Sequence, residues 1–278
     1  MFFLSILFQL HAINPVLAVA DSLYKNESYN QAITEYKRYV FLENKKDINS
    51  DVYVTISKCY RKLSQPDLSL KYIDAAIFNA ETDSLRSIRR VDKAIILMSM
   101  QKYSLAEFIL VREIQFSRYP EITNKANLTL SLDYALQSKW TEAENAIKQY
   151  ADKDNTVNPE DIKSVVNCLE EVQSRPLKDP VKAKRLSTFF PGAGQFYCGD
   201  IANGTNALAL DSALLGWAVY SVFTREVLNV YPILFLFWKY YQGNRYRAEL
   251  ICKQYNTNLQ SDNIKRITEK MSVLWNTN

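Results

Sequence analysis

Apolar and small residues recur at a fixed interval along the first half of the chain. A small residue returns every 37 positions, at Ala32, Ser69, Ala106 and Ala143, and large apolar residues stand nine positions before it and four after it. These offsets place an apolar stripe on each of two paired helices, and the small residue where the pair crosses most closely. The pattern predicts four helical hairpins, over about residues 21–42, 51–78, 88–116 and 125–150.

The predicted hairpins resemble the tetratricopeptide repeat, whose second helix has a small residue preceded by an aromatic residue and followed by a large apolar one. The segment LYKNESYNQAITEYKRYV matches best, and the resemblance extends over about residues 21–150. The family's usual period is three residues shorter, and we expect the excess in the connections NKKDIN, ETDSLR and SRYPEIT. The resemblance implies an all-α, tetratricopeptide-like solenoid of helical hairpins. An ordinary helical bundle has the same amphipathic spacing, but it has no reason to keep one register.

A further helix is expected directly after the fourth hairpin. Asn158 suits its N-cap, Pro159 suits its first turn, and an apolar face follows over residues 162–169. We interpret this helix as a cap on the exposed end of the stack, which closes a solenoid domain over residues 21–173.

The tetratricopeptide resemblance also implies a protein-binding groove, lined by the first helix of each pair. The register assigns to this groove residues that are basic at one end and apolar at the other: Tyr24, Lys25, Lys58, Arg61, Lys62, Ile95, Met98, Leu132 and Leu136. Such a groove suits an extended peptide with acidic residues. The competing interpretation is that these are solvated Lys and Arg side chains beside ordinary core residues.

The composition becomes apolar after a proline-containing, basic linker at residues 174–185. Two apolar segments, at about 205–223 and 227–241, are separated by the short turn Thr224-Arg225-Glu226. Their lengths and the aromatic residues near their ends predict a membrane-type helical hairpin, within a module over residues 186–255. Residues 256–278 predict a further, amphipathic helix.

A glycine-rich motif precedes this hairpin and consists of Pro191, Gly192, Gly194, Gln195, Tyr197, Gly199 and Gly204. The motif resembles that of a small domain with two transmembrane helices. In its P-G-x-G-Q-x-Y-x-G form it resembles uncharacterised bacterial envelope proteins, which carry it beside tetratricopeptide-like regions. The resemblance implies a location rather than an activity, and Gln195 stands where the family usually has a His. Asp211 lies inside the first apolar segment, where it either marks function or is buried against Asn206 or a backbone amide.

The N-terminus predicts export. An apolar stretch ends in Ala18-Val19-Ala20, with small residues where a signal peptidase needs them, so we expect a signal peptide at residues 1–20. Cleavage there would clip the first turn of the first helix, and an uncleaved N-terminal anchor is the alternative. We therefore expect the protein in a bacterial cell envelope, anchored in a membrane, with the repeats in the periplasm.

The sequence contains no set of residues that predicts catalysis. Its one histidine, His11, lies in the expected signal peptide, so the mature chain would have no imidazole to act as a base or metal ligand. The four cysteines are far apart and include no C-x-x-C pair. The formal net charge of +4 is too balanced to suggest nucleic-acid binding. We expect no enzymatic activity, no cofactor, no metal and no small-molecule substrate.

These features favour a membrane-anchored envelope scaffold that holds a protein or peptide partner in the groove and contacts the lipid bilayer through the hairpin. The alternative hypothesis is an oligomeric two-helix membrane component that assists protein insertion or transport. In that case the glycine motif and Asp211 would lie at the contact between copies.

Overall fold

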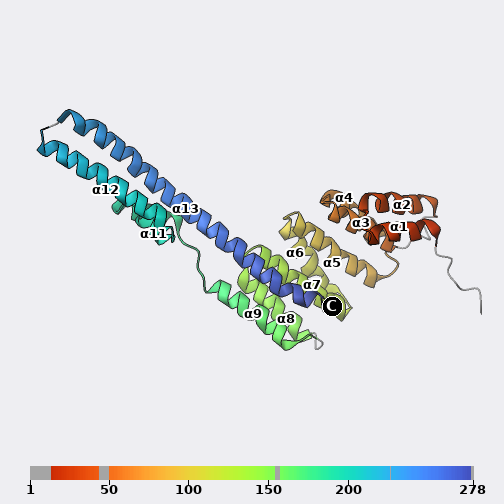
Figure 1. The fold of residues 1–278 in the computed structure, drawn as a ribbon. Coiled ribbons are helices and arrows are strands. Elements are labelled where there is room, and N and C mark those ends of the chain that lie inside the picture. The colour runs from red at the N-terminus through yellow and green to blue at the C-terminus, as the bar shows by residue number, and fades with distance from the viewer. Residues whose placement is uncertain (1–13, 44–49, 154–156, 226, 277–278) are drawn as a thin grey trace, which may run out of the picture. The chain divides into compact units, whose positions relative to one another are not determined.

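A computed structural model describes residues 14–43, 50–153, 157–225 and 227–276 (Figure 1). Within these ranges the chain forms thirteen α-helices and no strand, which confirms the predicted all-α class. The helices belong to two compact units. One consists of Met1–Val166 with Val273–Asn278, and the other of Asn167–Ser272.

Four helical hairpins build the first unit, as the repeat pattern predicts. They are α1 (Pro15–Lys25) with α2 (Tyr29–Leu42), α3 (Ser50–Lys62) with α4 (Pro66–Phe78), α5 (Asp83–Ser99) with α6 (Tyr103–Phe116), and α7 (Pro120–Leu136) with α8 (Trp140–Lys153). The first helix of each pair ends, and the second begins, at intervals of 37 residues. Each hairpin also packs on the next, since α2 contacts α3, α4 contacts α5 and α6 contacts α7.

A second series of small residues explains how closely the paired helices cross. Twelve positions before each small residue of the second helix stands another small residue in the first: Ala20, Ser57, Ala94 and Ser131. All eight residues are buried. At two crossings the side chains also bond across the pair, because Ser57 Oγ donates to the carbonyl of Ser69 at 2.8 Å and Ser131 Oγ to that of Ala143 at 2.8 Å. The period found in the sequence therefore belongs to both helices of each hairpin.

The turn inside each hairpin repeats in the same register. Four residues hold a left-handed backbone conformation, with φ of 59° at Glu27, 56° at Ser64, 57° at Gln101 and 59° at Ser138. None of them is glycine, the residue that adopts this conformation without steric cost. The turns are thus fixed by the packing of the helices that they join.

The period of this chain is three residues longer than that of the tetratricopeptide repeat. We expected the extra residues in the connections between hairpins, but at two of the three connections they lengthen the following helix. Helices α5 and α7 have 17 residues each, against 13 in α3. Thr82 caps α5 by accepting a hydrogen bond from the backbone N–H of Leu85, and Pro120 opens α7. Most of ETDSLR and SRYPEIT is therefore helical, while NKKDIN lies outside the described residues.

Helix α1 begins earlier than predicted, at Pro15, with the side chain of Asn14 capping the N–H of Val16 at 3.0 Å. Ala20 is fully buried and shares a core with Ala32, Tyr36 and other residues of the first two hairpins. Cleavage after Ala20 would therefore remove Pro15–Ala20, more than half of α1, rather than its first turn.

Helix α9 (Pro159–Gln173) starts as predicted, because the N–H of Glu160 donates to Asn158 Oδ1 at 3.0 Å. The division between the two units falls within α9, after Val166. Beyond it, the second unit contains α10 (Pro180–Phe189), α11 (Ala193–Tyr197), α12 (Ile201–Phe223) and most of α13 (Val227–Asn276).

Two features of this second unit differ from the sequence prediction. Helix α10 begins inside the expected linker at residues 174–185, where Asp179 caps the N–H of Val181 at 2.8 Å. Residues 256–276 do not form a separate helix, because α13 runs without interruption for 50 residues. Pro232 lies near its start, where few backbone hydrogen bonds are lost.

Candidate functional sites

The basic end of the predicted groove is partly assembled. Lys58 and Arg61 of α3 line a small groove of 40 Å³ together with residues of α4 and α5, among them Ile73, Asp92 and Ile96. Lys25 and Lys62 are exposed, and the ring of Tyr24 packs edge-on against Tyr29 at a centroid distance of 5.9 Å. The structure thus brings Lys58 and Arg61 together, next to an acidic residue from the following hairpin.

The apolar end of the predicted groove contributes mainly to the core. Met98 is buried in the cluster that contains Leu97, Ala106 and Leu110. Leu132 and Leu136 pack against the same cluster, and Ile95 is half-buried. At this end the competing interpretation, ordinary core residues, describes Met98 better than a binding role does.

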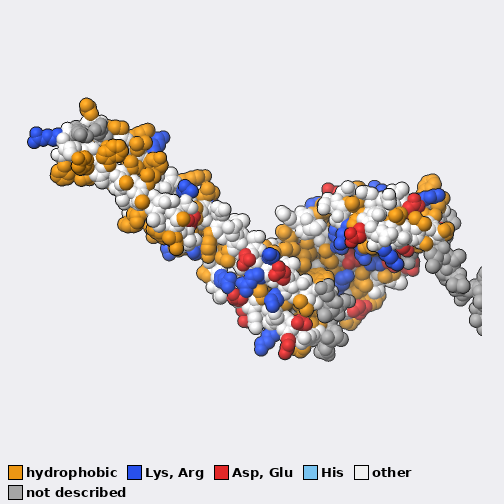
Figure 2. All heavy atoms as spheres, viewed as in Figure 1, with side chains coloured by type: hydrophobic (Ala, Val, Ile, Leu, Met, Phe, Trp, Pro, Cys, Tyr) orange, Lys and Arg blue, Asp and Glu red, His pale blue; other side chains and the backbone are white. Residues whose placement is uncertain are grey.

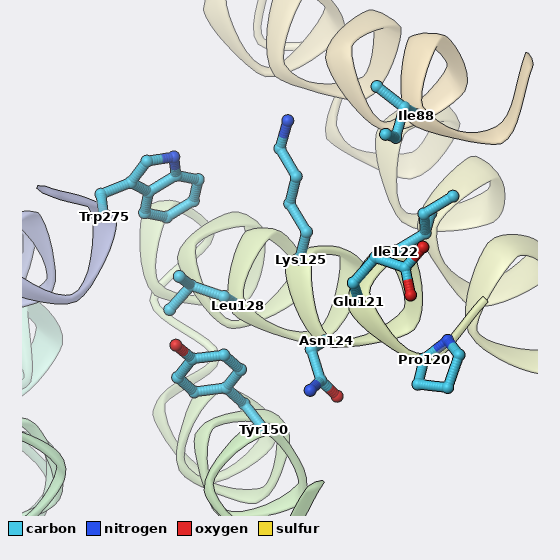
Figure 3. Close-up of a pocket in the computed structure, with 9 residues that line it drawn as sticks. All are labelled: Ile88, Pro120, Glu121, Ile122, Asn124, Lys125, Leu128, Tyr150 and Trp275. Atoms are coloured by element: carbon cyan, nitrogen blue, oxygen red, sulfur yellow. The ribbon is translucent and has the colours of Figure 1, made fainter. Parts of the chain in front are cut away.

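A larger cleft, of 630 Å³, lies beside the first turns of α7 (Figure 3). It is lined by apolar and polar side chains, namely Ile88, Pro120, Glu121, Ile122, Asn124, Lys125, Leu128, Tyr150 and Trp275. The sequence did not predict it, because the fourth hairpin was expected to begin only near residue 125. Pro120 could have indicated the earlier start of this hairpin, because proline favours the first turn of a helix.

Polar groups in this cleft are largely engaged within the first unit. Lys125 Nζ lies 3.1 Å from Asp92 Oδ1, and Asn124 Nδ2 donates to the carbonyl of Lys153 at 3.3 Å. The cleft combines these groups with Ile88, Ile122 and Leu128, a mixture typical of sites that hold part of a peptide or a small ligand.

Helix α7 is buried on most of its faces and carries an acidic residue in its interior. Asp133 has no exposed surface, and its Oδ2 accepts a hydrogen bond from Gln137 Nε2 at 2.8 Å. Burial, and to a smaller extent the nearby charge of Glu107, raises the pKa of Asp133 to about 7. This carboxyl is therefore a titrating group in the interior of the fourth hairpin.

Three second helices end in exposed phenylalanines that the sequence reasoning did not single out. Phe41, Phe78 and Phe116 lie in the last turns of α2, α4 and α6, and each is at least three-quarters exposed. Their near-regular spacing gives the first unit an apolar edge in addition to its basic groove.

The glycines of the motif in the second unit allow close backbone contacts. A Cβ added at Gly194 would lie 2.0 Å from the carbonyl oxygen of Ala183, and one at Gly192 would lie 2.3 Å from that of Gly204. At Gly204 it would lie 2.6 Å from the ring of Phe196. Gly192 and Gly199 also have φ of +88° and +85°, which favour glycine. Pro191 lies half-buried in the turn between α10 and α11.

A chain of buried polar groups connects the motif to α12 and α13. Ser187 Oγ donates to Gln195 Oε1 at 2.9 Å and accepts the N–H of Gly194 at 2.9 Å. Gln195 Nε2 donates to the carbonyl of Asn244 at 3.2 Å, and Asn244 Nδ2 donates to Asp211 Oδ2 at 2.9 Å. The structure thus unites Gln195 and Asp211, both fully buried, through residues that the sequence reasoning missed.

Asp211 is bonded to Asn244, whereas Asn206, one of the alternatives considered from the sequence, is exposed. Because α12 and α13 are separated by 33 positions at this contact, only the three-dimensional pairing of the helices identifies the partner. This arrangement supports the structural interpretation of Asp211 as a helix contact.

Basic residues around the motif are used to hold the unit together. Lys178 Nζ and Lys182 Nζ lie 5.7 Å and 5.2 Å from the ring centre of Tyr197, whose hydroxyl accepts the N–H of Asp179 at 3.3 Å. Lys184 Nζ lies 3.0 Å from Glu249 Oε2. Tyr197 therefore fastens the segment before α10 to the rest of the unit.

The surface of α12 and the first half of α13 is strongly apolar, and orange side chains gather over these helices in Figure 2. Among the described helices, Ile201–Phe223 alone is long and apolar enough to cross a bilayer, and only 22% of its apolar window is buried. The exposed large side chains include many aromatic ones: Trp217, Tyr220, Phe223, Tyr231, Phe235, Trp238 and Tyr240. The second predicted apolar segment, at 227–241, forms the start of α13 and does not meet this criterion by itself.

Metal-binding clusters are absent from the described part of the chain, where no three His, Cys, Asp or Glu side chains converge. All four cysteines are free and buried.

Comparison with known proteins finds similarity among solved structures. No family model matches the sequence. No curated protein matches it either. A similar solved structure is the C-terminal part of a TPR repeat-containing protein from Cytophaga hutchinsonii, at 15% identity, with 82% of this chain and 95% of that chain covered and a TM-score of 0.30.

Proposed function

We propose that this protein is a membrane-anchored scaffold that holds a protein or peptide partner on its stacked hairpins. One observation carries the proposal: the same chain combines repeated helical hairpins that have a basic groove with α12, a largely unburied helix of membrane-spanning length. An exposed apolar surface of this size requires lipid or protein around it.

The charge of the groove indicates the partner's chemistry. On α5, Arg90 and Lys93 lie 3.1 Å and 2.7 Å from Glu113 and Asp74. Lys58, Arg61 and Lys62 of α3, in contrast, are exposed, and Lys58 and Arg61 line the groove. These three charges are suited to attract and orient an acidic peptide segment.

Site-specific cross-linking in native membranes tests this assignment. A photoreactive residue at Lys62 is expected to capture a specific partner, whereas the same residue at exposed Lys71 on α4 is not. Lys58→Glu with Arg61→Glu should abolish the adduct. A matched double reversal at Arg38 and Lys71, away from the groove, should leave it intact. An adduct that survives reversal of the groove charges contradicts the assignment.

We further propose that the N-terminal apolar segment directs the chain to the envelope and that the repeats face the periplasm. The place of Ala20 in the core of the first hairpins favours retention of the segment from Asn14 onward over cleavage after Ala20. Mass spectrometry of the N-terminal peptide tests this, and a mature chain that starts at Asp21 contradicts it. Protease added to intact and opened cells reports the compartment of the repeats.

One observation favours the second candidate, an oligomeric membrane component. Ala209, Ser212 and Gly216 share an exposed face of α12, and a Cβ at Gly216 would meet no described atom within 4 Å. Small residues on such a face allow membrane helices to approach closely. Gly216→Cys should then cross-link copies in membranes, with Trp217→Cys, which points elsewhere on the helix, as the control. If neither variant gives a cross-linked dimer and both stay monomeric, this function is excluded.

A further inference from the structure

Two cysteines that are 54 positions apart in the sequence meet in the second unit. Cys198 is the C-cap of α11 and Cys252 lies in α13, and their exposed fractions are 3% and 0%. Together with Ala183 they form a separate small core, against which Tyr197 and Ile251 pack. The two cysteines are thus packed in the same buried cluster.

The other two cysteines have different surroundings. Cys59 is buried in the core of the first two hairpins, with Ala20 and Tyr36. Cys168 lies in α9, near Glu171 and Arg266. The chain therefore offers an internal comparison between one pair of adjacent thiols and two thiols in other environments.

We propose that Cys198 and Cys252 form a disulfide that fastens the glycine-rich turn to α13. This inference rests on the proposed export, because disulfides persist in oxidising compartments such as the bacterial periplasm. Two S–H bonds break and one S–S bond forms, while two protons and two electrons pass to the disulfide of a thiol oxidant, which becomes a dithiol.

Because both cysteines are buried in the folded protein, the stage at which the disulfide can form is limited. Burial, and to a smaller extent the neighbouring Cys252, raises the pKa of Cys198 to about 12. Since the thiolate is the reactive form, the folded, reduced protein should react slowly with oxidants. We therefore expect the two thiols to be oxidised while the exported chain folds, when both are still accessible.

The position of the bond suggests its role. It would close a loop that contains α12 and the first half of α13, and it would lie near the contacts of Gly194 with Ala183 and of Gln195 with Asn244. A cross-link at this place restricts the unfolded chain and holds the base of the apolar hairpin together. We expect the thermal midpoint of the second unit to fall by several degrees when the bond is absent.

The test uses the full chain, trapped with N-ethylmaleimide in intact cells and purified in mild detergent without reductant. After denaturation in excess reagent, the proposal predicts two adducts per chain, at Cys59 and Cys168, and one peptide pair linked through Cys198 and Cys252. Cys252→Ser should give three adducts and Cys59→Ser one. Four adducts on chains that protease accessibility places outside the cytoplasm would overturn the proposal.

A second measurement separates failure of this bond from failure of the proposed export. The purified full chain is unfolded and refolded into detergent in a mixture of oxidised and reduced glutathione. The geometry predicts the Cys198–Cys252 link as the dominant product, whatever the compartment of the natural protein. A different pairing, or none, overturns the proposal even if the protein proves to be an exported, partner-binding scaffold.

Discussion

At the scale of single residues, the turns of the four hairpins hold a left-handed conformation without glycine. Glu27, Ser64, Gln101 and Ser138 repeat every 37 residues, as the small residues at the helix crossings do. A non-glycine residue loses about 1 kcal/mol in this conformation. The packing of paired helices therefore outweighs an unfavourable local preference in every repeat.

This cost predicts that glycine stabilises the turn. Ser64→Gly should raise the free energy of unfolding of the first unit by about 0.5 kcal/mol, since relief of strain exceeds the added entropy of the unfolded chain. The control Lys71→Gly, at an exposed position in the middle of α4, should lower it by about 1 kcal/mol. Urea unfolding followed by circular dichroism measures both, and destabilisation by Ser64→Gly would contradict the assigned turn conformation.

Asp133 makes the stability of the solenoid depend on pH. The pKa of this buried acid is raised to about 7 in the folded state, above its unfolded value near 3.9, so the folded state binds the proton more tightly. Its favourable contribution is complete below about pH 4, declines as the pH rises, and is lost above about pH 7.

Asp133→Asn should remove this dependence. We expect the variant to be more stable than the natural chain at pH 8, by on the order of 3 kcal/mol, and to differ little from it at pH 4. The matched control Asp67→Asn, at an exposed position in the first turn of α4, should leave the pH profile unchanged. Thermal unfolding between pH 4 and 8 tests this prediction. Parallel curves of stability against pH for Asp133→Asn and the natural chain would contradict a raised pKa at Asp133.

At the scale of the helices, the glycine motif positions α10, α11 and α12 through backbone contacts. Gly194→Ala would place a methyl group against the carbonyl of Ala183 and should destabilise the second unit by about 2 kcal/mol. Gly216→Ala, in the open middle of α12, should be neutral or slightly stabilising in the same assay. Thermal unfolding in one detergent compares the two variants, and equal effects would show that the contact at Gly194 is not important.

Helix α1 is the element on which the first hairpin depends. Deletion of residues 1–20 removes the cap at Asn14 and the buried Ala20, so α2 should lose protection from amide exchange. Deletion of residues 1–13 keeps both and should leave α2 protected. Hydrogen exchange with mass spectrometry compares the two chains, and equal protection of α2 would mean that α1 contributes little to the repeat.

At the scale of the whole molecule, the sequence predicts best what depends on local periodicity. The four hairpins and the start of α9 at Pro159 follow from residues a few positions apart, and the structure confirms them. Contacts between distant positions could not be predicted, such as Asn244 with Asp211 or Cys198 with Cys252, because no local pattern pairs them. Helix length was also misjudged at α5, α7 and α13, where favourable caps or helix-forming residues extend the helices beyond the predicted breaks.

Flotation of native membranes in a sucrose gradient, after an alkaline carbonate wash, tests the proposal that the apolar second unit holds the repeats at a lipid bilayer. We expect the full chain to float with the lipid and to leave it only in detergent. A variant in which exposed Leu215, Trp217 and Val219 are replaced by Asp should lose this property. Recovery of the natural chain in the carbonate supernatant would show that the second unit is not embedded in the bilayer.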